Sequence, residues 1–298
     1  MKIDAIKNIF EKVIPLRVND IDGMRKLGQP VLDFINSKKN HEMFKNNLDN
    51  VTFDFNQRKY EADKIINCFD EQGIVVLKNF LNKDLINEIN IQISDLNLED
   101  AAEKYLVSKS SNEFKRLRKK NPSSFLINIR NAGDKGMIDL FNLDKVLSEN
   151  INNKVYELLS DELLKDLLAM KLNKEQKSIS LNAYLNKGIK NTRGFHVDAF
   201  YPVIKVMTYL TDVNCLSDGP YCYVCKSHNE KSLIQENKKI SYLYTGEYTD
   251  TPLINISHIT PILGEAGTMI FSDQAGHHRG LPQGANNKRA VLVAKYFN

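Results

Sequence analysis

The amino-acid sequence predicts an α+β protein with a mainly β core, in which helices come first and an antiparallel β-barrel or sandwich follows. Up to about residue 175, apolar residues recur mostly at the spacing of amphipathic helices. From residue 178 onward, short runs rich in β-branched and aromatic residues alternate with Gly, Pro, Asn and Asp turns, a pattern typical of antiparallel strands. The chain of 298 residues is 42% hydrophobic, which is enough to bury a sizeable core.

The chain divides by character into residues 1–60 and residues 61–298. Residues 1–60 alternate short amphipathic helical patterns with polar stretches such as NSKKNHEMFKNNLDN. We predict that they form an N-terminal helical extension, either packed on the main domain or loosely attached to it. Residues 61–298 are predicted to form one enzyme-sized domain, with its β core beginning at about residue 178.

The main domain opens with a helix, a strand and a second helix. A helical pattern runs to Gln72, and Gly73 suits the left-handed conformation that ends a helix. Residues 74–77 are predicted to be a short buried strand, and residues 85–96 an amphipathic helix. Further along, a long helical pattern extends over residues 144–170.

The C-terminal part contains a series of short predicted strands. They are SISLNAYL (178–185), IKVMTYLTDV (204–213), YCYVC (221–225), ISYLYT (240–245), LINISHI (253–259), TMIFSD (268–273) and AVLVAKYF (290–297). No helix is expected between them.

Composition restricts the classes of function. A net charge of +4 with 26% charged residues does not call for a nucleic-acid partner. No stretch approaches about 18 consecutive apolar residues, and the first residues lack the apolar core of a signal peptide, so no membrane span or secretion is expected. Four cysteines in such a chain favour a reducing cytosol over a disulfide scaffold. We therefore predict a cytoplasmic protein; the oligomeric state is not indicated.

The segment GFHVDAFYP, residues 194–202, places His196 and Asp198 one residue apart. In a strand, residues i and i+2 face the same side, so these two side chains would converge on one volume. Far downstream, GHHRGLPQGANNKR contains His277 and His278, and then Arg289, which opens the final predicted strand. Two histidines and one carboxylate are the ligand set of non-haem Fe(II) sites, which leave coordination positions open for a co-substrate and dioxygen. A nearby arginine could grip the far carboxylate of that co-substrate.

These motifs resemble the phytanoyl-CoA dioxygenase family of Fe(II)/2-oxoglutarate oxygenases. The resemblance lies in the order His-x-Asp, a long gap, and a histidine followed eleven residues later by an arginine. GIVVLKNFLNKDLINEI, IKVMTYLTDVNCLSDGPYCYVCKSH and GEAGTMIFSDQAGHHRGLP are similar to successive stretches of the family. The match covers roughly residues 60–298 and is weakest over 100–175.

The resemblance implies a fold and an activity. The fold would be a double-stranded β-helix (jelly-roll, cupin-like) with flanking helices. The activity would be hydroxylation, oxidative ring closure or desaturation of a small-molecule metabolite. The implied cofactors are Fe(II), 2-oxoglutarate as co-substrate and O2, with succinate and CO2 as co-products.

The resemblance also implies the site residues. His196, Asp198 and His278 would ligate the iron, because the family has a variable residue and then glycine after its distal histidine, which selects His278 over His277. Related halogenases lack the carboxylate, so Asp198 favours hydroxylation over halogenation. For 2-oxoglutarate the strong candidate is Arg289, with further candidates Asn182, Tyr184 and Thr192. Tyr184 could equally be an aromatic residue that fills the barrel.

Several alternatives compete with this interpretation. The barrel could be a metal-binding cupin-like module, or a zinc-dependent hydrolase or isomerase, although the triad together with Arg289 disfavours both. A nucleic-acid demethylase would add a second arginine where only Lys295 follows, and a prolyl-hydroxylase-like enzyme typically has lysine at position 289.

Two further motifs have plain structural explanations that we favour. Cys222-x-x-Cys225-x-x-His228 suggests zinc, but structural zinc needs four ligands and the other cysteines form no second pair. We expect chance spacing there, with His228 a turn residue that hydrogen-bonds to the backbone. The basic run KRLRKK at residues 115–120 could bind phosphate or a nucleotide handle, yet a solvated helix end is the expectation.

Overall fold

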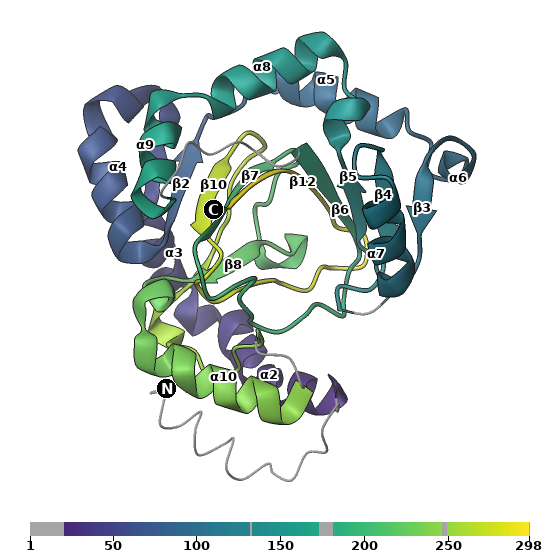
Figure 1. Cartoon of the computed structure of the whole chain (residues 1–298). Helices are drawn as coiled ribbons and strands as arrows, with labels where there is room; N and C mark the ends of the chain where they lie inside the picture. The colour runs from purple at the N-terminus through teal and green to yellow at the C-terminus, as the bar shows by residue number, and fades with distance from the viewer. Residues whose placement is uncertain (1–20, 132, 173–180, 246–248, 298) are drawn as a thin grey trace.

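The computed structural model describes residues 21–131, 133–172, 181–245 and 249–297, and it shows the predicted α+β jelly-roll with flanking helices (Figure 1). A nine-stranded sheet faces a three-stranded sheet. In spatial order the larger sheet contains β1 (Thr52–Asp54), β2 (Ile74–Lys78), β10 (Met269–Asp273), β7 (Val203–Tyr209), β12 (Lys288–Phe297), β6 (Leu181–Lys187), β5 (Ile138–Phe141), β4 (Leu126–Ile129) and β3 (Leu106–Ser108). The smaller sheet contains β11 (His278–Gly280), β8 (Tyr221–Val224) and β9 (Ile259–Pro261).

Helices cover the outer face of the larger sheet. They are α4 (Arg58–Gln72), α5 (Lys83–Ser94), α8 (Glu149–Leu159) and α9 (Glu162–Lys171), and Figure 1 shows them arching over the sheet. Strand alternation explains this layering: Leu292 and Ala294 of β12 belong to the core beneath the helices, whereas Val291 and Val293 face the barrel interior with Tyr209. The inward face of the larger sheet is therefore the wall of the barrel.

The N-terminal helices cover the smaller sheet. From α2 (Ile21–Asn36), Val31 and Ile35 pack against Cys222 and Val224 of β8, together with Phe44 of α3 (His41–Asp49). Strand β1 pairs in parallel with β2 and so joins the larger sheet. The division at residue 60 stays a prediction, and residues 1–20 lie outside the described part of the chain.

Several predicted elements are confirmed. Gly73 ends α4 with φ +76°, and β2 follows it directly. The helix predicted over residues 85–96 is α5, and each predicted strand except those at 240–245 and 253–259 overlaps an observed strand. The strand predicted over 204–213 ends earlier, at Tyr209. The pattern over residues 144–170 forms two helices rather than one. The break falls at Asp161, whose side chain accepts a hydrogen bond from the Leu163 N–H and caps α9.

Two predicted strands are wrong. ISYLYT lies in α10 (Lys231–Thr245), a helix that interrupts the β series. The buried positions Leu233, Asn237 and Ser241 recur at helical spacing, and the Asn237 amide bonds both backbone groups of Leu253, which pins the helix to the following segment. LINISHI forms a loop and a 3-10 turn up to His258, and only Ile259 lies in a strand. The backbone groups of Leu253 bond to the Asn237 side chain instead of to a neighbouring strand.

The helices of the described chain include none that is both long and apolar enough to cross a membrane.

The remaining helical segments are short: α6 (Ala101–Lys104) and α7 (Ser111–Lys120) flank β3, and α7 carries the basic run at an exposed helix end, as expected.

Gly267 provides a test of the packing between β10 and the start of α5. Its φ is +95°, and a Cβ there would collide with the Leu81 carbonyl oxygen. We expect Gly267→Ala to lower the free energy of unfolding by roughly 2 kcal/mol or more, measured by urea denaturation. Gly194→Ala is the matched control, because a Cβ at Gly194 meets no atom within 4 Å. An equal loss in both variants would contradict this packing.

His228 makes the stability of the fold depend on pH. Its Nε2 lies 3.2 Å from the Asp70 carbonyl oxygen, which confirms the expected backbone contact. Burial and, to a lesser extent, the Lys171 ammonium lower the pKa of His228 to about 4. Between about pH 6.5 and pH 4 the unfolded chain takes up a proton that the folded chain does not, so stability must fall as the pH falls.

The measurement is the free energy of unfolding of the metal-free protein at several pH values in that window. We expect the loss of stability on acidification to be smaller in His228→Gln than in the natural chain, by up to about 1.4 kcal/mol per pH unit. Identical slopes in the two proteins would show that His228 is protonated in the folded state as readily as in the unfolded one.

Candidate metal centre

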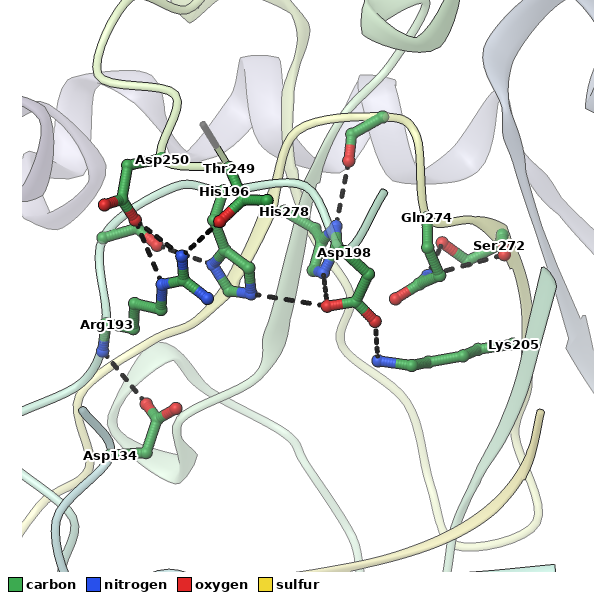
Figure 2. A network of polar contacts seen from close by, with 12 residues as sticks. Asp134, Arg193, His196, Asp198, Lys205, Thr249, Asp250, Ser272, Gln274 and His278 are labelled. Carbon is green, nitrogen blue, oxygen red and sulfur yellow. Dashed lines mark hydrogen bonds and ion pairs between the residues drawn. The ribbon is translucent and has the colours of Figure 1, made fainter. Parts of the chain in front are cut away.

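Backbone pairing brings the two predicted halves of the site together. The His196 N–H donates to the His278 carbonyl oxygen at 3.0 Å, and the His278 N–H donates to the His196 carbonyl oxygen at 2.9 Å. The Asp198 N–H donates to the Gln274 carbonyl oxygen at 3.0 Å. The His-x-Asp segment is thus extended but lies outside the named strands, and the fully buried Val197 faces away from the site. His196 and Asp198 share one side, as predicted (Figure 2).

Three ligand atoms converge in this place. Asp198 Oδ1 lies 4.0 Å from His196 Nε2 and 3.7 Å from His278 Nε2, and the three atoms lie within 4.8 Å of one another. Across the described ranges, no other His, Cys, Asp or Glu side chains form such a group. Three ligands on one face of an octahedron, each at about 2.1 Å from the metal, lie about 3 Å apart. The two histidine–carboxylate distances need to close by about 1 Å and the widest separation in the group by up to about 2 Å, which side-chain rotations can supply.

Both imidazoles are held in the tautomer that metal binding requires. His196 Nδ1 lies 2.9 Å from the Gly194 carbonyl oxygen, and His278 Nδ1 lies 2.9 Å from the Gly276 carbonyl oxygen. A carbonyl oxygen only accepts, so each Nδ1 carries the proton and each Nε2 lone pair points toward Asp198. Burial, and then the Arg193 guanidinium, hold the pKa of His196 well below its usual value, so the ring is neutral and able to bind a metal.

The carboxylate of Asp198 is kept ionised. Burial alone would raise its pKa, but the Lys205 ammonium outweighs burial and holds the pKa well below its usual range. Lys205 Nζ lies 2.5 Å from Asp198 Oδ2. Burial alone would lower the pKa of Lys205. Asp198, and then Tyr184, outweigh burial and raise the pKa above its usual value, so the ammonium keeps its charge. Two imidazoles and one carboxylate fit a divalent first-row metal ion.

The structure separates His277 from His278. His277 is fully buried and lies outside the ligand group, and neither of its ring nitrogens has a hydrogen-bond partner among the described residues. Burial lowers the pKa of His277 to about 3, so that the ring is neutral. Adjacent residues of an extended segment face opposite sides, which is why only His278 reaches Asp198.

Arg289 and two of the other predicted co-substrate residues lie on the inward face of the larger sheet. Val291 pairs with Tyr184, so Arg289, two residues before Val291, faces the same side. Arg289 is buried, its Nη1 donates to the Gly219 carbonyl oxygen, and its Nε has no hydrogen-bond partner in the described structure. An unpartnered buried guanidinium N–H calls for a carboxylate acceptor.

The remaining candidates are engaged with protein groups. Asn182 Oδ1 accepts a hydrogen bond of 3.2 Å from the Asn142 N–H. The Tyr184 ring lies under the Arg130 guanidinium, with 5.9 Å from the guanidinium carbon to the ring centre. Thr192 lies off the sheet, and its hydroxyl accepts a 2.9 Å hydrogen bond from Arg279 Nη2. The roles of Arg289 and of these three residues stay predictions.

Sequence reasoning gave Arg193 and Gln274 no role. The Arg193 guanidinium binds Asp250 Oδ1 at 2.8 and 3.1 Å, and the Arg193 N–H donates to Asp134, which anchors the chain just before His196 (Figure 2). Gln274 is fully buried and extends from the chain beside Asp198. The partners of Arg193 are all distant along the chain, so no local sequence signal identifies it. Gln274 bonds to the nearby Ser272 and to the distant Tyr221.

The zinc motif does not assemble. Cys222 packs beneath the N-terminal helices, while Cys225 belongs to the barrel interior and lies 3.2 Å from the Thr260 hydroxyl. Burial raises the pKa of Cys225 to about 11, which opposes thiolate formation. The favoured interpretation, chance spacing, agrees with this separation.

Comparisons with known proteins identify the fold. No protein-family model matches the chain, and no curated protein matches it. Among solved structures, the non-heme alpha ketoglutarate dependent epimerase SnoN from nogalamycin biosynthesis superposes with a TM-score of 0.53, at 14% sequence identity over 80% of this chain and 83% of that one. The carbocyclase SnoK of the same biosynthesis gives a TM-score of 0.54, at 14% identity over 79% and 85%. The chain shares the fold of these enzymes.

A third structure agrees with this assignment. AviO1 from Streptomyces viridochromogenes Tue57 superposes with a TM-score of 0.52, at 15% identity over 80% of this chain and 95% of that one. The shared fold is the double-stranded β-helix with flanking helices, which confirms the predicted fold class. Sequence identities this low concern the fold alone.

Substitution of the adjacent histidines tests the ligand set. We expect His278→Ala to weaken Ni(II) binding by more than about a hundredfold, because one of three ligands is lost. His277→Leu is the matched control: it should keep the Ni(II) affinity and lose no stability, since a leucine leaves no buried nitrogen unpartnered. The measurement is titration calorimetry with Ni(II), together with urea denaturation. A larger loss of affinity in the His277 variant would reverse the assignment.

Proposed function

We propose that the protein is an Fe(II)- and 2-oxoglutarate-dependent oxygenase of the phytanoyl-CoA dioxygenase type, acting on a small molecule. One observation carries the proposal: two Nε2 atoms and one carboxylate oxygen converge on this fold, with both Nδ1 atoms bonded to backbone carbonyls. Such a set binds one face of a metal ion and leaves the other face for reactants.

His196, Asp198 and His278 would hold the iron. With Fe(II), 2-oxoglutarate and O2 bound, the site supplies the oxidising power to hydroxylate, cyclise or desaturate a substrate, and succinate and CO2 are the co-products. The neutral imidazole of His196 and the ionised Asp198 would bind a dication without first losing a proton. Because Asp198 occupies the position that halogenases leave vacant, the carboxylate favours oxygenation over halogenation.

Arg289 would bind the far carboxylate of 2-oxoglutarate. Its guanidinium lies on the barrel wall, buried, with an N–H that has no partner in the described structure. A charge-assisted hydrogen bond in a site of low dielectric is stronger than the same bond in water. Asn182, Tyr184 and Thr192 are proposed as further contacts for this co-substrate.

The solved neighbours support the cofactors and a small-molecule substrate. One SnoN structure contains Fe3+, alpha ketoglutarate and nogalamycin RO. SnoN is an epimerase and SnoK a carbocyclase, so one fold accommodates different oxidative outcomes. We propose that residues 61–298 form the catalytic domain and residues 1–60 an extension. The four free cysteines support a cytoplasmic location, and we propose neither a nucleic-acid nor a membrane partner.

A metal-binding module without turnover, or a zinc-dependent hydrolase or isomerase, is the alternative. Neither explains Arg289, whose charge is buried on the barrel wall at the cost of desolvation. A module that only binds metal has no need of a buried guanidinium in addition to the three metal ligands. The oxygenase assignment uses both the triad and Arg289.

Anaerobic addition of Fe(II) and 2-oxoglutarate to the protein tests the proposed function. We expect a weak visible metal-to-ligand charge-transfer band, which requires both reagents, and succinate once O2 is admitted. Zn(II) in place of Fe(II) is the control and should give neither signal. A folded protein that shows no band and no succinate would refute the oxygenase assignment.

Arg289→Ala tests the co-substrate site separately. Loss of a buried charge-assisted contact should raise the 2-oxoglutarate concentration needed for half-maximal band intensity by at least about tenfold, while Ni(II) affinity stays the same. Arg58→Ala is the matched control, since it removes an Arg–Asp161 ion pair of 2.7 Å outside the site. An unchanged 2-oxoglutarate requirement would place the co-substrate elsewhere.

A further inference from the structure

The two oxygens of Asp198 serve different partners. Oδ1 faces the Nε2 atoms of His196 and His278, at 4.0 and 3.7 Å. Oδ2 is held by Lys205 Nζ at 2.5 Å, and Figure 2 shows the lysine reaching the carboxylate from the side opposite the imidazoles. The same carboxylate is therefore divided between the metal position and an ammonium.

Lys205 is built into the barrel wall. It lies in β7, on the inward face, and its register partners are Ser272 in β10 and Lys295 in β12. Its side chain is only 13% exposed. Lys205 lies on a central strand with a paired strand on each side, so the sheet fixes its backbone position beneath the site.

The number of metal–oxygen bonds at Asp198 decides how many positions remain for reactants. A carboxylate binds a metal through one oxygen or through both. A facial triad leaves three open positions, and 2-oxoglutarate with O2 needs all of them. A second bond from Oδ2 would remove one of these positions.

We propose that Lys205 is a positioning residue that restricts Asp198 to a single metal–oxygen bond, through Oδ1. The inference rests on the proposed metal centre. It deepens the proposed function, because an ion pair within the barrel wall would keep three coordination positions of the metal free for 2-oxoglutarate and O2.

The choice of lysine rather than arginine agrees with this role. An ammonium is a point donor that can hold one oxygen and leave the other free, whereas the guanidinium fork of arginine matches both oxygens of a carboxylate. Arginine at position 205 would therefore compete with the metal for Oδ1.

Two substitutions of Lys205 should have different effects: one should weaken the binding of 2-oxoglutarate, and the other should weaken the binding of Co(II). In Lys205→Met, Oδ2 is released and the ammonium in contact with Asp198 no longer opposes the dication, so Co(II) should bind at least as tightly as in the natural chain. Its visible spectrum should change, because Oδ2 joins the metal, and 2-oxoglutarate should bind the Co(II) form about tenfold more weakly. In Lys205→Arg, Co(II) binding itself should weaken about tenfold.

The experiment titrates Co(II), and then 2-oxoglutarate, into each folded variant, with calorimetry and visible absorption as readouts. Lys226→Met is the matched control, since it breaks a Lys–Glu71 ion pair of 2.6 Å outside the site and should change neither affinity. Far-ultraviolet circular dichroism shows which variants are folded. If Lys205→Met does not fold, Lys205→Arg, which keeps a cation beside Asp198, still decides the matter through its Co(II) affinity.

Two results would overturn the inference while leaving the proposed function intact. One is a natural chain that binds Co(II) and 2-oxoglutarate, with Lys205→Met showing the same spectrum and the same 2-oxoglutarate affinity. The other is a Lys205→Arg variant that binds Co(II) as tightly as the natural chain. A natural chain that binds no Co(II) would instead refute the metal centre itself.

Discussion

The site depends on one short stretch of backbone pairing, the two hydrogen bonds of 3.0 and 2.9 Å between His196 and His278. They join a segment between β6 and β7 to the start of β11, so that the ligands form a single group although they are distant along the chain. The same pairing continues through Asp198 and Gln274. Any change that shifts this register by one residue would turn the side chains to opposite faces and separate the ligand set.

The chain that carries His196 is held on both sides by charged groups. Arg193 bonds to Asp250 after α10, and its backbone bonds to Asp134, which in turn pairs with Arg130 of the β4–β5 connection. Arg130 also forms two hydrogen bonds with the buried carboxylate of Asp139. These ion pairs are partly buried, and their directional hydrogen bonds favour one arrangement of the chain before His196, which is what a ligand set requires.

The strand pattern predicted an antiparallel barrel or sandwich, with His196 and Asp198 on one face of the chain. The resemblance to a known family implied the jelly-roll and the choice of His278 as the third ligand. The predictions for residues 240–245 and 253–259 were wrong, because Asn237 binds Leu253 across a loop and a local pattern does not contain that tertiary contact. For the same reason the sequence could suggest that Lys205 forms a salt bridge, but not with which oxygen. Strand register, which places Lys205 between two other strands, follows from the whole sheet and not from its own segment.

The charges of the site are balanced in a way that suits the proposed reactants. Asp198 and Lys205 cancel each other, and the imidazole of His196 is neutral, so this part of the site carries no net charge before a metal binds. A dication then leaves the centre positive in surroundings of low dielectric, where an unbalanced charge is costly. A dianionic co-substrate would offset the charge of the dication, and Arg289 is the residue proposed for its far end. A zinc hydrolase that binds only water has no dianion to offset the charge of its metal ion.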